Sequence, residues 1–418
     1  MKKILSVVAF FLVCATTYAG GFRVSLQGNR ALAMGHTGVA VVNSAELAFF
    51  NPAGLIHLEN KLNVSVGGFG VTSNISFQNN EFSQAVEADS PVGTPVYLYA
   101  SYALSDNFAI GLAIYTPYGS EVEYPTDWVG SHLVNQINLE AIYFQPLFSW
   151  KINKAVSLGG GPILANGAVE FNRNLNRTLT DLEGNRSNVT IEDSGVTSFG
   201  WTAGVLFNAG EKWKFGFNYR SRIILEAENG DATFSNVPNS PLAGVSNGTI
   251  GFNAEIPLPA EWTIGLSYQP NEKWLLALDY VLDEWSAYEN LDIDFIPEGV
   301  PDSSNPRNYE DAIIVRVGAQ YQASNVVTLR GGYYFDESPI REGFFAPETP
   351  RNNSHGITGG FSINVNDRIS IDASLLYLFF PEIDASFDFF EENGQFVPFG
   401  GTYQSNAFSG GVGVSYNL

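Results

Sequence analysis

The final segment, AFSGGVGVSYNL at residues 407–418, alternates in polarity along its length. Phe408, Val412, Val414, Tyr416 and Leu418 share one parity, and small or polar residues occupy the other. Successive side chains of a β-strand point to opposite faces, which produces this period of two. The segment therefore predicts a strand with one face against an apolar medium and one face against a polar medium.

The same alternation recurs from residue 61 onward, in segments such as 199–208, 213–222, 262–269 and 357–365. Six tight turns lie between such segments, at 105–107, 153–154, 210–211, 271–272, 324–325 and 366–367. Long polar connections alternate with them, near 79–94, 118–135, 174–194, 229–247, 297–310, 337–353 and 391–403. Seven long and six short connections join fourteen strands. Short turns on one side and long loops on the other are typical of an outer-membrane barrel with both termini in the periplasm.

Composition supports this class of protein. The chain has 21 Lys and Arg against 43 Asp and Glu, a net charge of -22, which argues against nucleic acid as a partner. Charged residues are only 15% and aromatics reach 14%, which excludes a disordered chain. Phe108, Trp150, Trp213 and Trp274 lie beside short turns, where an interfacial girdle would place them. The alternative is a secreted β-sandwich or propeller, but the strands are long for a sandwich and no blade-length repeat is present.

The first residues predict a leader peptide at 1–19. Lys2 and Lys3 precede an apolar run of 12 residues, 4–15, which is too short to span a membrane, and Thr17 and Ala19 are small residues suited to cleavage. Cys14, the one cysteine, lies inside this peptide. The exported chain would then contain neither a disulfide nor a thiolate metal site.

Residues 20–60 do not alternate and predict a plug inside the barrel, which itself spans 61–418. Residues 30–34 and 45–50 have the pattern of short helical turns, and Asn51 followed by Pro52 is suited to begin another. The alternative is a periplasmic tail. The many Ala, Val, Leu and Phe side chains favour burial in the lumen.

No arrangement of residues indicates an enzyme or a cofactor. Ser131 and His132 raise the alternative of an outer-membrane lipase, but no Gly-x-Ser-x-Gly elbow accompanies them, and a solvated loop histidine is expected. Acidic residues cluster around one long loop, from Asp283 to Asp311. A hydrated exterior loop is the expected explanation, with divalent-cation binding as the alternative.

Two features of the predicted lumen could bind a ligand. The inward parity of the strand at 369–380 turns apolar at Leu376, Leu378 and Phe380, which predicts either an apolar ligand site or packing against the plug. Inward parity also predicts four arginines in the lumen, Arg220, Arg222, Arg316 and Arg330. They could hold a ligand carboxylate, or they could form ion pairs with residues such as Asp279 and Glu140.

The stretches at 28–35 and 51–55, together with several later blocks, resemble the FadL/TodX family of outer-membrane channels for hydrophobic compounds. Residues 28–35 and 51–55 are similar to the start of that family's plug, although a wider group of barrels shares this opening. The blocks at 115–119 with 127–130, 258–268, 274–285 and 330–340 match in order along nearly the whole chain. The loop at 346–353 and the terminal Leu418 depart from the family pattern.

The resemblance implies a plugged 14-stranded barrel that acts as a monomer without cofactors. It implies passive uptake of long-chain fatty acids or other apolar molecules, with capture at the outer loops. The ligand would pass through a pocket beside the plug and leave into outer-membrane lipid through a wall gap where the third strand kinks. Asn51, Pro52 and Ala53 should touch that strand, Gly111 should mark the kink, and Phe22 should lie near the pocket. The alternative is a structural or secretion-associated barrel of the wider group.

Overall fold

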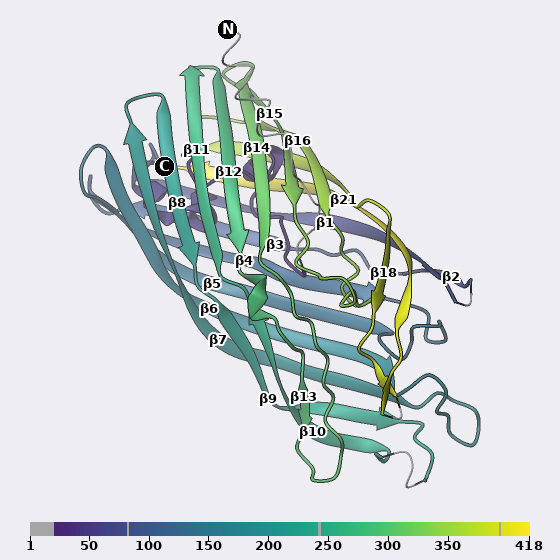
Figure 1. The fold of residues 1–418 in the computed structure, drawn as a ribbon. Helices are drawn as coiled ribbons and strands as arrows, with labels where there is room; N and C mark the ends of the chain where they lie inside the picture. Colours follow the sequence, from purple (N-terminus) through teal and green to yellow (C-terminus); the bar gives the residue numbers. More distant parts are fainter. Residues whose placement is uncertain (1–20, 82, 241–243, 393) are drawn as a thin grey trace.

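The computed structural model describes residues 21–81, 83–240, 244–392 and 394–418 (Figure 1). The predicted leader at 1–19 lies outside the described residues. Among those residues, none of the helices has the length and apolar character needed to cross a membrane.

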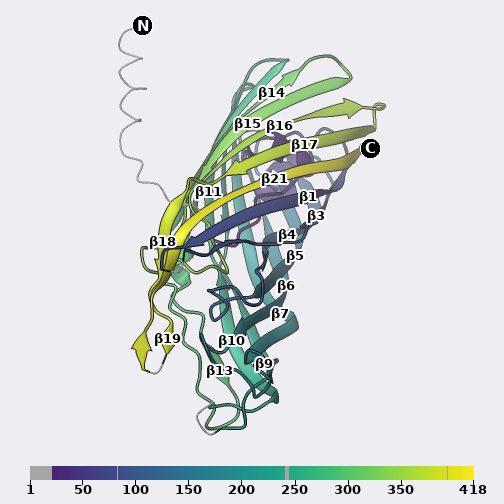
Figure 2. The same ribbon diagram turned by 90° about the vertical axis from the view of Figure 1, so that its right-hand side faces the viewer.

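The described chain forms a closed antiparallel barrel of fourteen strands, as the count of turns predicted (Figures 1 and 2). Two of these strands are each interrupted once and therefore carry two labels. β1 pairs with β21 from Asn63 with Asn417 to Asn79 with Gly401, which closes the cylinder. The wall consists of β1 (Leu62–Asn79), β3 (Val96–Ala103), β4 (Phe108–Glu123), β5 (Gln136–Lys151), β6 (Val156–Asn174), β7 (Asn188–Ala209), β8 (Trp213–Arg220) with β9 (Ile223–Ser235), β10 (Gly248–Leu258) with β11 (Glu261–Asn271), β12 (Trp274–Asp283), β14 (Ala312–Gln322), β15 (Val327–Asp336), β16 (Ser354–Asn364), β17 (Ile369–Phe379) and β21 (Phe399–Asn417).

Alternating burial defines the two faces of the wall. In β5, every second residue from Ile137 to Ser149 is buried, whereas Phe144, Phe148 and Trp150 are exposed toward the surroundings of the barrel. All six predicted tight turns join neighbouring strands. The long connections carry the short strands β2 (Ala85–Glu87), β13 (Ile293–Phe295), β18 (Ile383–Phe387), β19 (Glu391–Glu392) and β20 (Gln395–Phe396), and the turn η4 (Trp285–Ala287).

Lysine is confined to one end of the barrel. All lysines of the described residues lie in the short turns or in the strand ends beside them, at positions 61, 151, 154, 212, 214 and 273. The C-terminal end of β21 lies at the same end, because the N–H of Asn417 donates to the carbonyl of Arg368 in a short turn. Acidic residues, by contrast, predominate in the long loops.

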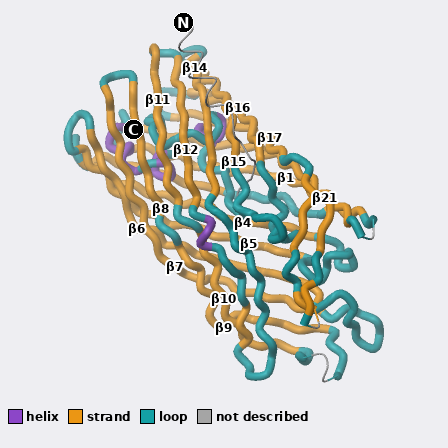
Figure 3. The backbone as a smooth tube through the Cα atoms, viewed as in Figure 1, coloured by secondary structure: helices purple, strands orange, loops and turns teal. Residues whose placement is uncertain are grey.

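The N-terminal segment, defined here as residues 21–61, contains α2 (Asn29–Ala33), α3 (Leu47–Phe50) and η2 (Pro52–His57). α2 contacts β15, β16, β17 and β21, whereas η2 contacts β4 to β7 in another part of the wall. Figure 3 shows these helices surrounded by strands near the C-terminus. Almost every residue from 21 to 56 is buried. The segment therefore occupies the lumen close to the short-turn end.

Candidate functional site: two cavities and a bulged wall strand

The third wall strand, β4, has a bulge at Thr116 and Pro117. Tyr115 faces Tyr143 of β5 and Tyr118 faces Ala141, so β4 contains one more residue than its partner over this interval. Pairing of β4 with β3 ends at Tyr115 with Tyr97. Proline has no N–H to donate to a neighbouring strand, which favours a break in the ladder at this position. The expected kink at Gly111 was wrong, because Gly111 pairs regularly with Ser101 and Leu147.

The N-terminal segment forms hydrogen bonds with backbone groups of β4 that have no partner in a neighbouring strand because of the bulge. The N–H of Val24 donates to the carbonyl of Pro117 at 2.8 Å, and the N–H of Gly119 donates to the carbonyl of Phe22 at 3.0 Å. The side-chain amide of Gln27 donates to the carbonyl of Thr116 at 3.0 Å. Buried backbone groups need such partners, so the bulge and the N-terminal segment stabilise one another.

Asn51, Pro52 and Ala53 lie away from this bulge. Asn51 caps η2 by accepting from the N–H of Ala53 at 3.1 Å, and its Nδ2 donates to the carbonyl of Val205 in β7. The carbonyl of Ala53 accepts from Ser149 in β5 and Ser157 in β6. The three residues therefore anchor η2 to β5, β6 and β7. Contact of η2 with β4 is made elsewhere: a Cβ on Gly111 would lie 2.7 Å from Cδ1 of Leu55.

A cavity lies beside the bulge and is lined by residues from both faces of the wall, and we call it the wall cavity. Residues 91–95 line one side, and Gly119, Ser120 and Glu121 of β4 line the other. Inside the barrel it is bounded by residues 23–26 and by Leu376, Leu378 and Phe380. Exposed residues on the outer side, Asn138 and Glu140, also line it. The apolar inward patch predicted at Leu376, Leu378 and Phe380 thus lines this cavity.

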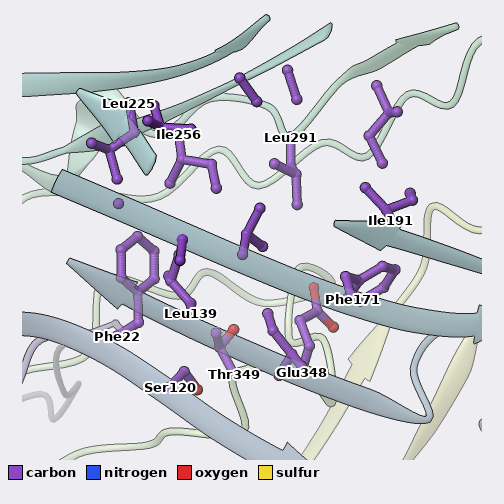
Figure 4. A pocket seen from close by; sticks show the side chains of 18 of the residues that line it. Phe22, Ser120, Leu139, Phe171, Ile191, Leu225, Ile256, Leu291, Glu348 and Thr349 are labelled. Carbon is purple, nitrogen blue, oxygen red and sulfur yellow. The ribbon is translucent and has the colours of Figure 1, made fainter. Parts of the chain in front are cut away.

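A second cavity, the apolar cavity, lies toward the long loops (Figure 4). Aliphatic and aromatic side chains surround it, including Leu139, Phe171, Ile191, Leu225 and Ile256. Such a predominantly apolar lining with few polar groups is typical of small-molecule sites.

Phe22, which the resemblance places near a ligand pocket, lines the apolar cavity. Its ring packs edge-on against Trp285 with centroids 5.0 Å apart, and it also contacts Tyr118 and Tyr288. Ser120 and Leu139 line both cavities. The two cavities therefore adjoin at Ser120 and Leu139, and the stretch from Phe22 to Leu26 lies along their boundary.

Residues 10–418 match the sequence family described as "Outer membrane protein transport protein (OMPP1/FadL/TodX)". The chain belongs to this family. It is 25% identical to the 47 kDa outer membrane protein of Pasteurella multocida, with 98% of this chain and 97% of the relative covered. It is 19% identical to the long-chain fatty acid transport protein of Escherichia coli K12, over 89% and 90% of the two chains. Like other members of the OMPP1/FadL/TodX family, it is a protein of the Gram-negative outer membrane.

Solved structures agree on the fold. A FadL homologue of Pseudomonas aeruginosa superposes with a TM-score of 0.83 at 17% identity, covering 95% of this chain and 100% of the homologue. The toluene transporter TodX of Pseudomonas putida gives 0.74 at 17% identity, covering 96% and 99%. At these identities the likeness establishes the barrel architecture of this family member.

Three of the four arginines predicted in the lumen, Arg220, Arg316 and Arg330, are buried in this OMPP1/FadL/TodX barrel, but they line neither cavity. Arg220 pairs with Glu261 at 3.1 Å, and Arg330 donates to Gln320 and Ser362. Arg316 is also enclosed by the barrel, at 2% exposure.

Three further expectations about charged residues were wrong. Arg222 is exposed, because the break between β8 and β9 shifts the alternation and turns Ile223 inward. Glu140 faces outward and so cannot pair with an arginine of the lumen. Asp283 belongs to no exterior loop: it is buried, and its Oδ2 lies 3.6 Å from Nη1 of Arg23.

His132 is also not the solvated side chain that was expected. It is 2% exposed and packs against Phe390, with ring centroids 4.6 Å apart, and against Phe399. Burial and the nearby Arg173 and Arg177 lower the pKa of His132 to about 3. Ser131 accepts a hydrogen bond from Asn174. Among the described residues, no group of three or more His, Cys, Asp or Glu could hold a metal ion.

Sequence reasoning missed the residues that shape the cavities of this family member. Pro117 interrupts an otherwise alternating segment, and a proline inside a wall strand is a signal for a bulge. Arg23 follows directly after Phe22 in an apolar stretch, which could have marked it as a buried cation in need of a partner. Arg307 and Glu348 lie in separate long loops, and nothing in the sequence indicates their contact.

Proposed function

We propose that this protein is a passive channel that takes up apolar molecules and releases them sideways into the outer membrane. The observation that carries the proposal is the junction of the apolar cavity with the wall cavity at Ser120 and Leu139. A molecule captured between the long loops would enter the apolar cavity, move past Phe22 and leave beside Pro117. Transport, rather than catalysis, is the role that the family membership supports.

Lateral release suits an apolar cargo on energetic grounds. A molecule leaving through the short-turn end would expose its hydrocarbon to water at a cost of about 0.8 kcal/mol per methylene. The N-terminal segment fills the lumen near that end and impedes this route. An exit in the wall would let the cargo pass directly from the apolar cavity into the apolar membrane.

Two relatives bear on the class of cargo. The relative in Escherichia coli is named a long-chain fatty acid transport protein, and the structural neighbour in Pseudomonas putida is named a toluene transporter. We therefore propose long-chain fatty acids or other hydrophobic compounds as cargo, and a monomer that exchanges it with membrane lipid. Phe22, Leu376, Leu378 and Phe380 would contact the cargo, and Asn51 to Ala53 would hold the N-terminal segment in place.

Uptake by a bacterium that lacks its own fatty-acid channel tests the proposal. Radiolabelled long-chain fatty acid and radiolabelled toluene would both be offered, and a heat-modifiable gel shift would confirm the folded barrel. Ser120→Trp should fill the junction of the two cavities and abolish uptake. Glu123→Trp, three residues along the same strand on the exposed outer side, is the matched control and should transport normally. A folded barrel that takes up neither compound would favour the secretion-associated alternative.

A further inference from the structure

Among the described residues, the charged side chains that line the apolar cavity are the two members of one ion pair. It joins Arg307, in the loop before β14, to Glu348, in the loop before β16. Nη2 of Arg307 donates to Oε1 of Glu348, and both side chains are 6% exposed. The pair therefore forms a charged but internally neutralised spot in an otherwise apolar cavity.

Arg307 uses its charge and two of its donors in contacts within the protein. Nη1 donates to the carbonyl of Pro306 at 3.3 Å, and the guanidinium lies 5.2 Å from the ring centroid of Phe387. Burial alone would lower the pKa of Arg307, but the charge of Glu348 and the neighbouring Tyr288 and Tyr309 raise it overall. Glu348 thus occupies the position in which a ligand carboxylate would bind.

The surroundings of the cavity add further negative charge. A groove shares Ala227 and Ala254 with the apolar cavity, and it is lined by Glu226, Glu228, Glu255, Glu289, Asp292 and Asp294, with Arg222 as its one cation. Arg173 is another cation that interacts electrostatically with Glu348. It does not line the cavity, and it donates to the carbonyl of His132 and to Ser303.

We propose that Glu348 determines cargo specificity, an inference that rests on the proposed transport function. Because Glu348 is the counter-ion of Arg307 within the protein, the apolar cavity selects uncharged molecules over carboxylates. A fatty-acid anion that entered would have to displace Glu348 from Arg307. One carboxylate would then remain buried without a partner, which is strongly unfavourable in an apolar site. An uncharged molecule of the same chain length needs no such exchange.

Equilibrium binding to the purified full-length protein in detergent micelles at pH 8.5 tests this proposal. The probes are radiolabelled dodecanoate and methyl dodecanoate, which share a chain and differ in charge. The wild-type protein should bind the ester about tenfold more tightly than the anion, or better. Glu348→Gln should release Arg307 and strengthen dodecanoate binding by about tenfold, because a charge-assisted bond becomes available, with ester binding nearly unchanged.

Two variants control for indirect effects. Arg307→Gln combined with Glu348→Gln should lose the gain for dodecanoate. Glu342→Gln removes an exposed carboxylate from the same loop and should leave both affinities unchanged. Equal binding of both probes by the wild type would overturn this proposal while leaving the transport function intact. Binding of neither probe would overturn the transport function as well. The wild-type comparison decides the matter even if Glu348→Gln fails to fold.

Discussion

Nη2 of Arg23 lies 2.5 Å from Oε2 of Glu261, in a pair that is almost fully buried. Glu261 begins β11, while the backbone of Arg23 bridges Tyr118 in the bulged part of β4. Arg23 therefore connects the strand that borders the wall cavity with another part of the barrel wall. The position of the N-terminal segment depends on an electrostatic contact as well as on packing.

Replacing Arg23 with Met should release the first residues of the N-terminal segment. Loss of one partner of a buried pair costs about 3–5 kcal/mol, and here that cost would weaken local anchoring because Glu261 retains Arg220. Hydrogen exchange of residues 21–28 in the purified protein should accelerate strongly while exchange in β5 and β6 stays slow. Arg368→Met, at an exposed turn, is the control. Unchanged exchange in Arg23→Met would show that packing alone holds the segment.

Deleting Pro117 should remove the bulge and close the opening. β4 has one extra residue between Tyr115 and Tyr118, so a single deletion restores regular pairing with β5 and keeps the inward and outward faces of the flanking residues. Uptake of the cargo in intact cells should fall to the level of cells without the channel, although the gel shift reports a folded barrel. Deletion of the exposed loop residue Glu183 is the control. Full uptake by the Pro117 deletion would exclude exit beside the bulge.

Gly111 should matter through Leu55 rather than through a kink. A methyl group at position 111 would lie 2.7 Å from Cδ1 of Leu55, so Gly111→Ala should displace η2 and destabilise it by about 1–3 kcal/mol. Hydrogen exchange of residues 52–57 measures this effect. Adding Leu55→Ala provides space for the new methyl group. The destabilisation of η2 in the double variant should therefore be smaller than the sum of the destabilisations in the two single variants. Strict additivity would rule out the contact as the cause.

The loop around His132 should open in acid. The pKa of His132 is lowered from 6.5 to about 3 by burial and nearby arginines, so the native state holds the neutral ring. The free energy of opening the loop is at its maximum above pH 6.5. It falls by about 1.4 kcal/mol per pH unit as the pH falls from 6.5 toward 3, because the opened state binds the proton. Hydrogen exchange of residues 124–135 should therefore accelerate over this range. His132→Phe should abolish that dependence, and a flat wild-type profile would contradict the buried neutral ring.

The sequence predicted the wall far better than it predicted the lumen. Alternation such as that of Phe408, Val412 and Val414 is local and follows directly from the two media on either side of a strand, so strands and short turns could be located. The bulge at Pro117 also left a local signal, but the family resemblance directed attention to Gly111. Contacts such as Arg23 with Glu261 join residues more than two hundred positions apart. Alternation contains no information about such pairs, because many inward carboxylates satisfy the same pattern.

The confinement of lysine to the short-turn end has a practical consequence for work on living cells. Because the short turns of an outer-membrane barrel face the periplasm, the described part of the protein presents no primary amine of a lysine side chain to the outside of the cell. Amine-reactive biotin esters that cannot cross the outer membrane would leave the protein unmarked on intact cells, and would modify it once the envelope is broken. A surface inventory based on such reagents would therefore overlook this protein.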